Sequence, residues 1–198
     1  MRRSPFRQFM VFITVSALMG TAFVPLTAYY LRTEIRLGMN LILFFTAVQY
    51  FGAIIGTLIM RSRIDRVGAK PVFRLSLIIG ASISTYWFFL VTGWIPVSVT
   101  GLTIAFCAFG LSSSQWLLAQ LKYMPRVCDE NKRALHISIH AAAAGVIGGI
   151  TPIIWGWLVK VPGQKPGVQS EWFAWYFLAL LTAQLLMFFY VPKLTSQH

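Results

Sequence analysis

Five long runs of the chain contain no charged residue, and they constrain the fold more than any other feature. They cover residues 8–31, 37–60, 75–121, 134–159 and 172–192. A helix needs about 20 apolar residues to cross the roughly 30 Å hydrocarbon core of a bilayer. Only 11% of the residues are charged, whereas a soluble domain carries about 25%. The runs therefore predict an all-α, polytopic membrane protein.

The run 75–121 is too long for a single span, because as one helix it would measure on the order of 70 Å. Its helix breakers lie in Thr92-Gly93-Trp94-Ile95-Pro96, where Gly ends one helix and Pro starts the next. In the first run, Pro25 predicts a kink. We expect a single bundle over residues 1–198 with six transmembrane helices, at about 7–31, 38–60, 71–92, 96–121, 134–159 and 172–192.

Basic residues are divided unequally between the two sides of these spans. Thirteen of the 17 Lys and Arg fall on one side and four on the other. Cytoplasmic loops carry the excess of Lys and Arg, so we expect both termini in the cytoplasm and place the protein in a plasma membrane, such as a bacterial inner membrane. The net charge of +12 is then explained without nucleic-acid binding, since the basic residues fill short gaps between apolar runs.

The loop between the second and third expected spans carries a motif. It reads Arg61-Ser-Arg-Ile-Asp65-Arg66-Val-Gly68-Ala-Lys70-Pro71. This loop resembles the signature loop of the major facilitator superfamily, Gly-x-x-x-Asp-Arg-x-Gly-x-Lys/Arg, and it has the same place in a six-span unit. Asp65, Arg66, Gly68 and Lys70 match that pattern, while Arg61 stands where the family has glycine.

The resemblance implies a secondary transporter whose complete form has twelve spans in two six-span halves, each half a 3+3 inverted repeat. This chain corresponds to one half. We favour the C-terminal half, because Ser4-Pro5-Phe6-Arg7 resembles the entry from the linker into the seventh helix. The N-terminal half is the alternative.

The motif loop is a candidate gate, because a carboxylate in a short loop beside a helix end can dock on another helix. We expect the Asp65 carboxylate to dock on the positive N-terminus of a helix in the other half in one gate state, with Arg66 and Lys70 as alternative ion-pair partners. The alternative is an ordinary charged turn in which Gly68 only permits a positive φ.

Polar residues on the spans are candidates for a substrate cavity, which the resemblance places along the first, second, fourth and fifth helices. We expect Gln49 and Gln115 to hydrogen-bond the substrate, and Tyr50 and Trp116 to be aromatic walls. Alternatively these polar groups only join helices, at about 0.6 kcal/mol per contact. Gln120 shares the stripe of Trp116 near the end of its span and is not included. The candidates are Thr46, Gln49, Tyr50, Ser112, Gln115 and Trp116.

Small residues at i, i+4 and i+8 line one face of the fifth expected span. They are Ala141, Gly145 and Gly149, and such a stripe lets helices approach closely. The stripe continues to Pro152 and Gly156, similar to the Pro- and Gly-punctuated helices of the superfamily. We therefore expect Gly145, Gly149, Pro152 and Gly156 to mediate helix packing.

Catalytic and metal-binding patterns are missing from the sequence. His136 and His140 are four residues apart but lack further ligands, and no nucleophile has a paired base. We expect no enzyme activity, no metal and no cofactor. No Asp or Glu lies inside an expected span, so the acid of a proton-driven carrier would lie in the other half.

Together these features predict one half of a secondary active transporter for a small, neutral, sugar-like solute. The expected partners are the lipid bilayer, a small-molecule substrate and a second six-helix half, which is either the rest of a longer chain or another copy. A truncated, non-transporting fragment and a membrane scaffold or assembly protein are the alternatives.

Overall fold

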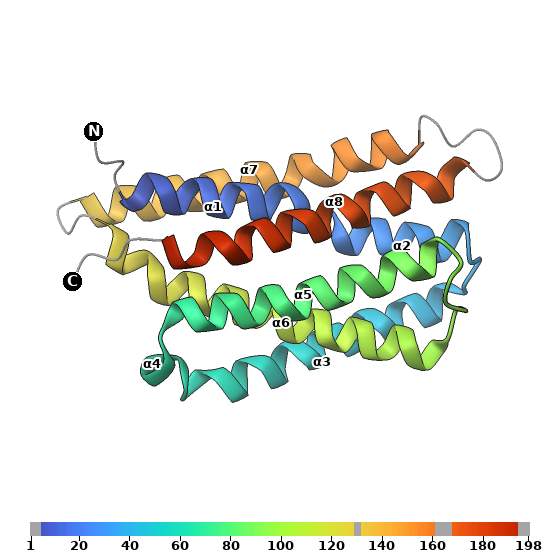
Figure 1. The fold of residues 1–198 in the computed structure, drawn as a ribbon, viewed down its shortest axis with the longest axis horizontal. Coiled ribbons are helices and arrows are strands. Elements are labelled where there is room, and N and C mark those ends of the chain that lie inside the picture. The colour runs from blue at the N-terminus through green and yellow to red at the C-terminus, as the bar shows by residue number, and fades with distance from the viewer. Residues whose placement is uncertain (1–4, 129–131, 161–167, 194–198) are drawn as a thin grey trace.

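The computed structural model describes residues 5–128, 132–160 and 168–193, and these residues form helices joined by short turns (Figure 1). No strand occurs among them, which confirms the all-α class. The elements are α1 (Pro5–Gly20), α2 (Phe23–Thr33), α3 (Met39–Arg61), α4 (Ile64–Val67), α5 (Ala69–Val91), α6 (Val99–Val127), α7 (Arg133–Lys160), α8 (Val168–Tyr190) and the 3₁₀ turn η2 (Val191–Lys193).

Six helical segments of the described chain are long and apolar enough to cross a membrane. The first combines α1 and α2, and the others are α3, α5, α6, α7 and α8. Together with the absence of strands in this part of the chain, they identify a polytopic α-helical membrane protein. The N-terminus of α1 and the C-terminus of α8 lie at the same end of the bundle (Figure 1).

The long charge-free run turns at the expected place, but α6 begins later than expected. Gly93 has a φ of +78°, a value that favours glycine. Pro96 remains in the loop, and α6 starts at Val99 after the N-cap Ser98, whose hydroxyl oxygen accepts a hydrogen bond from the amide of Gly101. A serine N-cap satisfies an otherwise unpaired amide at the helix start, so it determines the boundary here in place of proline.

The first span is interrupted rather than merely kinked. Helix α1 ends at Gly20 and α2 begins at Phe23, so the break lies just before Pro25. A proline has no N–H to donate to the carbonyl four residues earlier, and its ring clashes with that carbonyl. In this chain that carbonyl belongs to Thr21, inside the break.

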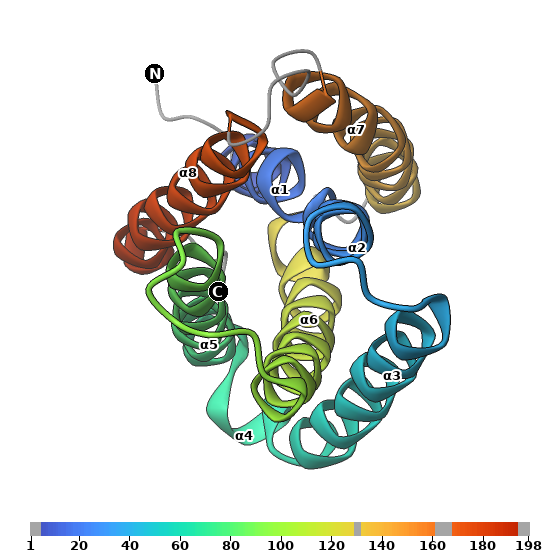
Figure 2. The same cartoon turned by 90° about the vertical axis from the view of Figure 1, so that its right-hand side faces the viewer.

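Viewed along the bundle, the helices form three groups (Figure 2). The first span and α6 lie in the middle, with α5 and α8 on one side and α3 and α7 on the other. Two clusters of buried apolar side chains fill the bundle, one around Trp87 and Phe177 and the other around Phe73 and Tyr123.

Glycines bring α3 and α6 into close contact. A Cβ atom at Gly110 of α6 would overlap the carbonyl oxygen of Gln49, and one at Gly52 of α3 would overlap the carbonyl oxygen of Cys107. Gly56, four residues after Gly52, meets Ser114 and Leu111 in the same way. The close helix contact of this chain is therefore built on α3 and α6, and the sequence analysis did not identify it.

The expected glycine contact of α7 is not made within the part of the chain that the structure describes, so it stays a prediction for a partner helix outside this bundle. No atom lies within 4 Å of a Cβ placed at Gly145, Gly149 or Gly156, and Pro152 is half-buried inside the helix. Bulky rings join α7 to α1, including the stack of His136 on Phe6 at 4.0 Å between ring centroids, and the glycine face is turned away from this contact.

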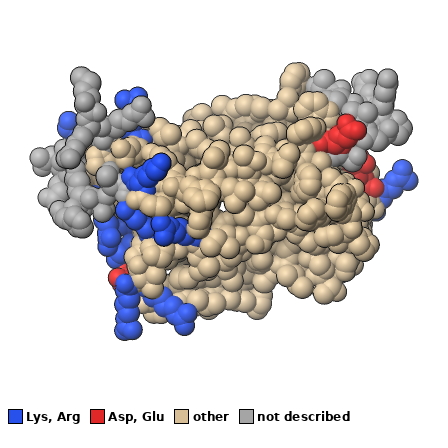
Figure 3. All heavy atoms as spheres, in the orientation of Figure 1, with Lys and Arg blue, Asp and Glu red and all other residues tan. Residues whose placement is uncertain are grey.

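Charged side chains lie at the two ends of the bundle (Figure 3). On the face shown, Lys and Arg gather at the end where α1 begins, and an uncharged belt covers the middle. This distribution agrees with helices that cross a hydrocarbon core, where a charged side chain is costly.

Candidate functional site

The break in the first span exposes backbone carbonyls that two other helices satisfy. Trp155 of α7 donates from Nε1 to the carbonyl of Leu18 at 3.1 Å, and the Tyr176 hydroxyl of α8 donates to the carbonyl of Met19 at 2.8 Å. The two rings pack edge to face, with centroids 4.8 Å apart. Discontinuous helices line binding sites in many transporters, so this break marks a candidate site.

A cavity of about 360 Å³ lies beside the break. It extends between the two apolar clusters, where α1, α5, α6 and α8 meet. Small-molecule sites typically have volumes of about 300–1,000 Å³. No Asp, Glu, Lys or Arg is among its lining residues.

Hydroxyl and amide groups supply the polarity of this cavity, and most of them already have partners. Ser76 of α5 donates to the Ser112 carbonyl at 2.8 Å, and Ser112 donates to the Ser76 carbonyl at 2.9 Å. Ser84 donates to Oε1 of Gln184 at 2.9 Å. These pairs join α5 to α6 and to α8, so they hold the wall of the cavity in place.

Two polar lining residues, Gln120 and Ser16, differ from these pairs. Gln120 on α6 and Ser16 on α1 both line the cavity, and neither has a hydrogen-bond partner in the described part of the chain. An amide and a hydroxyl without partners can bind a solute that carries donors and acceptors.

The structure brings together only part of the cavity expected from the sequence. Ser112 and Trp116 line it, and Trp116 also packs on Phe12 and Phe73. Thr46 instead donates to the Ile42 carbonyl of its own helix at 3.0 Å, and Tyr50 is 65% exposed on the surface of α3.

Gln49 and Gln115 also lie outside this cavity. Gln115 is only 2% exposed, and Oε1 of each amide is buried without a partner among the described residues. The second span contributes no lining residue and the fifth only Ala144, because the glycine face of α3 is packed directly against α6. The wall therefore comes from the first, third, fourth and sixth spans.

Gln120, Gln184, Ser84 and Ser76 are among the polar lining residues that were not predicted from the sequence. A signal for Gln120 was present, since Ser112, Trp116 and Gln120 repeat every four residues and share one face of a helix. Gln184 is the main polar residue of the sixth span, but its partner Ser84 is 100 positions away in the chain.

The motif loop lies at the basic end of the bundle and contains the short helix α4. Gly68, with a φ of +85°, separates α4 from α5, and no atom lies within 4 Å of a Cβ placed there. Glycine is thus required at this position by the backbone conformation rather than by lack of space.

Asp65 of this loop pairs with Lys122 of α6, which differs from the expected pairing with Arg66 or Lys70. The last turns of α6 lie against α4 and bring Lys122 to the carboxylate. The hydrogen bond from Lys122 lowers the pKa of Asp65 below its usual value of 3.8, and the charges of Lys122 and then Arg126 act in the same direction. The pair joins the second and fourth spans at this end of the bundle.

No group of three or more metal-binding side chains occurs in the described part of the chain. His136 stacks on Phe6, and His140 stacks on Phe9 with ring centroids 6.2 Å apart. Both histidines therefore contribute to the contact between α1 and α7.

Comparison with known proteins agrees with this architecture. The family model described as Major Facilitator Superfamily matches residues 9–198, which is nearly the whole chain. No curated protein and no solved structure gave a significant match. The chain belongs to the major facilitator superfamily, and its six apolar helices correspond to one half of such a transporter.

Proposed function

We propose that this chain is half of a secondary transporter for a small, neutral, hydroxyl-rich solute such as a sugar. Its membership of the family establishes a transporter in general terms. The uncharged cavity beside the broken first span supports the choice of solute. A charged solute in that cavity would have no counter-charge, and an unpaired charge is costly away from water.

Gln120 and Ser16 are the proposed solute contacts, because their polar atoms have no partner within the described chain. Trp116 is the proposed aromatic wall, as the sequence suggested. Gln49, Thr46 and Tyr50 remain proposed contacts for a solute held between two halves, since α3 lies on the outer side of the bundle (Figure 2). Gln115 also stays a predicted contact, although its side chain is buried on α6.

A second six-helix half is the proposed protein partner, and α3 and α7 form the face that it covers. These helices carry large exposed apolar side chains, including Phe51, Ile54, Ile153 and Trp157, and the glycine stripe of α7 faces outward. The second half is either the rest of a longer chain or another copy. We assign this chain to the C-terminal half and its basic end to the cytoplasmic side of a bacterial inner membrane.

The motif loop is the proposed gate. In this conformation Lys122 holds Asp65 within the same half, and in the other gate state Asp65 docks on a helix N-terminus of the second half. If the carrier is a symporter, its coupling carboxylate belongs to that second half, because no Asp or Glu lies inside an expected membrane span of this chain.

Calorimetric titration of the full chain in lipid nanodiscs tests the proposal, with neutral hexoses compared with the matching hexuronic acids. We expect the neutral sugars to bind more tightly and Gln120→Ala to weaken binding about fivefold, because a neutral hydrogen bond contributes about 1 kcal/mol. Thr57→Ala is the control, since the Thr57 hydroxyl donates to the Ala53 carbonyl of its own helix.

Tighter binding of the acids would contradict the neutral solute. Equal effects of Gln120→Ala and Thr57→Ala on sugar affinity would show that the solute does not bind in this cavity. A chain that binds no sugar in either variant or in the wild type would favour the fragment or scaffold alternative.

A further inference from the structure

A second hollow lies between α5 and α8. It is a surface groove of about 640 Å³. Leu77 and Gln184 line both this groove and the cavity beside the first span, so the two hollows are neighbours. Its walls include Ile78, Ala81, Ser82 and Thr85 of α5 and Leu185 and Phe188 of α8. These positions belong to the apolar belt of two membrane-spanning helices, so lipid is the medium to which the groove opens.

The walls of the groove suit an apolar occupant. Ser82 donates to the Ile78 carbonyl at 3.0 Å, and Thr85 donates to the Ala81 carbonyl at 2.8 Å. These hydroxyls already serve their own helix, and the amide of Gln184 is the other polar group of the wall, with its Oε1 accepting a hydrogen bond from Ser84. The rest of the groove presents aliphatic and aromatic surface. Such a surface binds hydrocarbon better than a polar solute.

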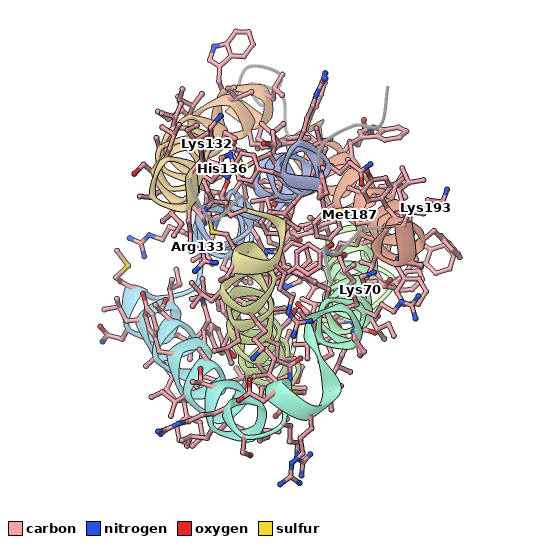
Figure 4. All side chains as sticks on the ribbon, turned by 90° about the vertical axis from the view of Figure 1, so that its left-hand side faces the viewer. Lys70, Lys132, Arg133, His136, Met187 and Lys193 are labelled. Atoms are coloured by element: carbon pink, nitrogen blue, oxygen red, sulfur yellow. The ribbon has the colours of Figure 1, made fainter. Side chains whose placement is uncertain are left out.

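One end of the groove carries positive charge. Arg74 lies one helical turn before Ile78, and its guanidinium carbon is 6.0 Å from the centroid of the Phe188 ring. Lys70 lies one helical turn before Arg74, in the first turn of α5. Lys193 lies in η2, directly after α8. Lys70 and Lys193 lie on the same side of the basic end, opposite Lys132 and Arg133 at the start of α7 (Figure 4).

These three cations have no acidic partner in the described part of the chain, where the ion pair found is that between Asp65 and Lys122. The stack on Phe188 holds the guanidinium of Arg74 at the groove end through a cation–π contact and leaves its N–H groups for an anion. Phosphate is a good match, because the planar fork of arginine binds its oxygens in pairs.

The length of the groove matches one acyl chain. From Arg74 to Thr85 the helix rises about 16 Å at 1.5 Å per residue, and one leaflet contributes about 15 Å of hydrocarbon. A lipid whose phosphate contacts Arg74 would therefore place its acyl chain along the whole groove.

We propose that the groove between α5 and α8 is a specific binding site for an anionic phospholipid of the leaflet at the basic end. Arg74, with Lys70 and Lys193 beside it, binds the phosphate, and the surface from Ile78 to Thr85 binds one acyl chain. The site is on the outer face of the half and does not depend on the transported solute.

Native mass spectrometry of the full chain tests this site by titration with dioleoylphosphatidylglycerol and, separately, dioleoylphosphatidylcholine. We expect the anionic lipid to bind at least fivefold more tightly. Arg74→Gln should weaken its binding about fivefold, which corresponds to about 1 kcal/mol for one basic residue near the membrane surface. Ser82→Trp should weaken it by a similar factor, because the indole fills the acyl groove while the charges remain.

Matched controls separate this site from general attraction to a basic surface. Arg63→Gln removes one charge from the same end but lies before α4, and Val146→Trp adds an indole to α7, where Val146 is 59% exposed. Neither should change the affinity for the anionic lipid. Lys193→Gln gives a second charge variant that leaves the contact between Arg74 and Phe188 intact.

Three results would overturn the proposal. The first is equal binding of the two lipids. The second is an equal loss in Arg74→Gln and Arg63→Gln, which would indicate only diffuse charge. The third is complete competition by millimolar glycerol 1-phosphate or inorganic phosphate together with no effect of Ser82→Trp, which would indicate a site for the free ion.

Discussion

Individual residues of this chain have different roles although they match similar patterns. Gly68 is required for its positive φ, Gly110 for lack of space, and Gly145 for neither within this chain. Asp65 fits the family motif, and its partner Lys122 lies 57 positions further along the chain. A motif thus identifies which residue acts, and the fold identifies what that residue contacts.

Asp65→Asn should slow exchange between gate states, because the amide loses the ion pair with Lys122 and the charge that docks in the other state. The Asp65 side chain is 67% exposed and that of Lys122 is 34% exposed, so solvent screens the pair and the melting temperature should stay nearly unchanged. Solute uptake into vesicles reconstituted with the complete carrier measures the first effect, and thermal unfolding measures the second. Unchanged uptake would contradict the gate.

The pH dependence of this pair follows from the lowered pKa of Asp65. A carboxyl whose pKa is lower in the folded protein contributes stability above its unfolded pKa and loses that contribution as the pH falls through the folded value. Since that pKa is below 3.8, the pair should persist from neutral pH to about pH 4. Infrared absorption of the Asp65 carboxyl, with Asp65→Asn as the blank, would detect earlier protonation.

Among the helix pairs, α3 and α6 are packed so closely that a single added methyl group at one of their glycines would overlap the facing helix. Gly52 and Gly56 on α3 and Gly110 on α6 allow backbone to touch backbone, as small residues do in membrane helix pairs. Helix α7 has the more conspicuous glycine stripe but makes its contacts to α1 through rings.

Gly110→Ala should destabilise the bundle by about 3 kcal/mol, at the upper end of overpacking costs, because the new methyl group would overlap the Gln49 carbonyl. Gly145→Ala is the matched control and should be neutral in the isolated chain, as its Cβ would meet no atom within 4 Å. Unfolding in mixed detergent with increasing denaturant measures both. Equal stabilities of the two variants would show that α3 and α6 are not in close contact.

At the scale of the whole molecule, the membrane-spanning helices are buried to very different extents within the bundle. Only 6% of the most apolar window of α7 is buried, compared with 44% for α5 and α6. The helices with the least cover, α7 and α3, lie on the same side of the bundle (Figure 2), which is the face we assign to the second half.

If the second half is another copy, Gly149→Leu should abolish association while the isolated bundle stays folded. The leucine would project from Gly149, whose Cβ would meet no atom within 4 Å among the residues that the structure describes, so only a partner helix would be displaced. Crosslinking of the purified chain in lipid nanodiscs measures the association. A wild-type chain that is strictly monomeric would exclude the self-assembled carrier and leave the rest of a longer chain as the second half.

The sequence alone predicted the number of spans, the basic end of the bundle and the span boundaries within a few residues, except that α6 ends at Val127 rather than at about 121. Each of these follows from local hydropathy and charge, which depend on the chain's contact with lipid and water. Even the break near Pro25 was visible as a kink, since the missing N–H is a local property.

Only the tertiary structure decided which faces meet. In a soluble protein, polar and apolar faces tell the inside from the outside, but a lipid-facing surface is as apolar as a buried one. The rotation of each helix about its axis therefore leaves little trace in the sequence. For this reason Ser84 with Gln184, Asp65 with Lys122, and the glycine contact between α3 and α6 appeared only when the helices were packed together.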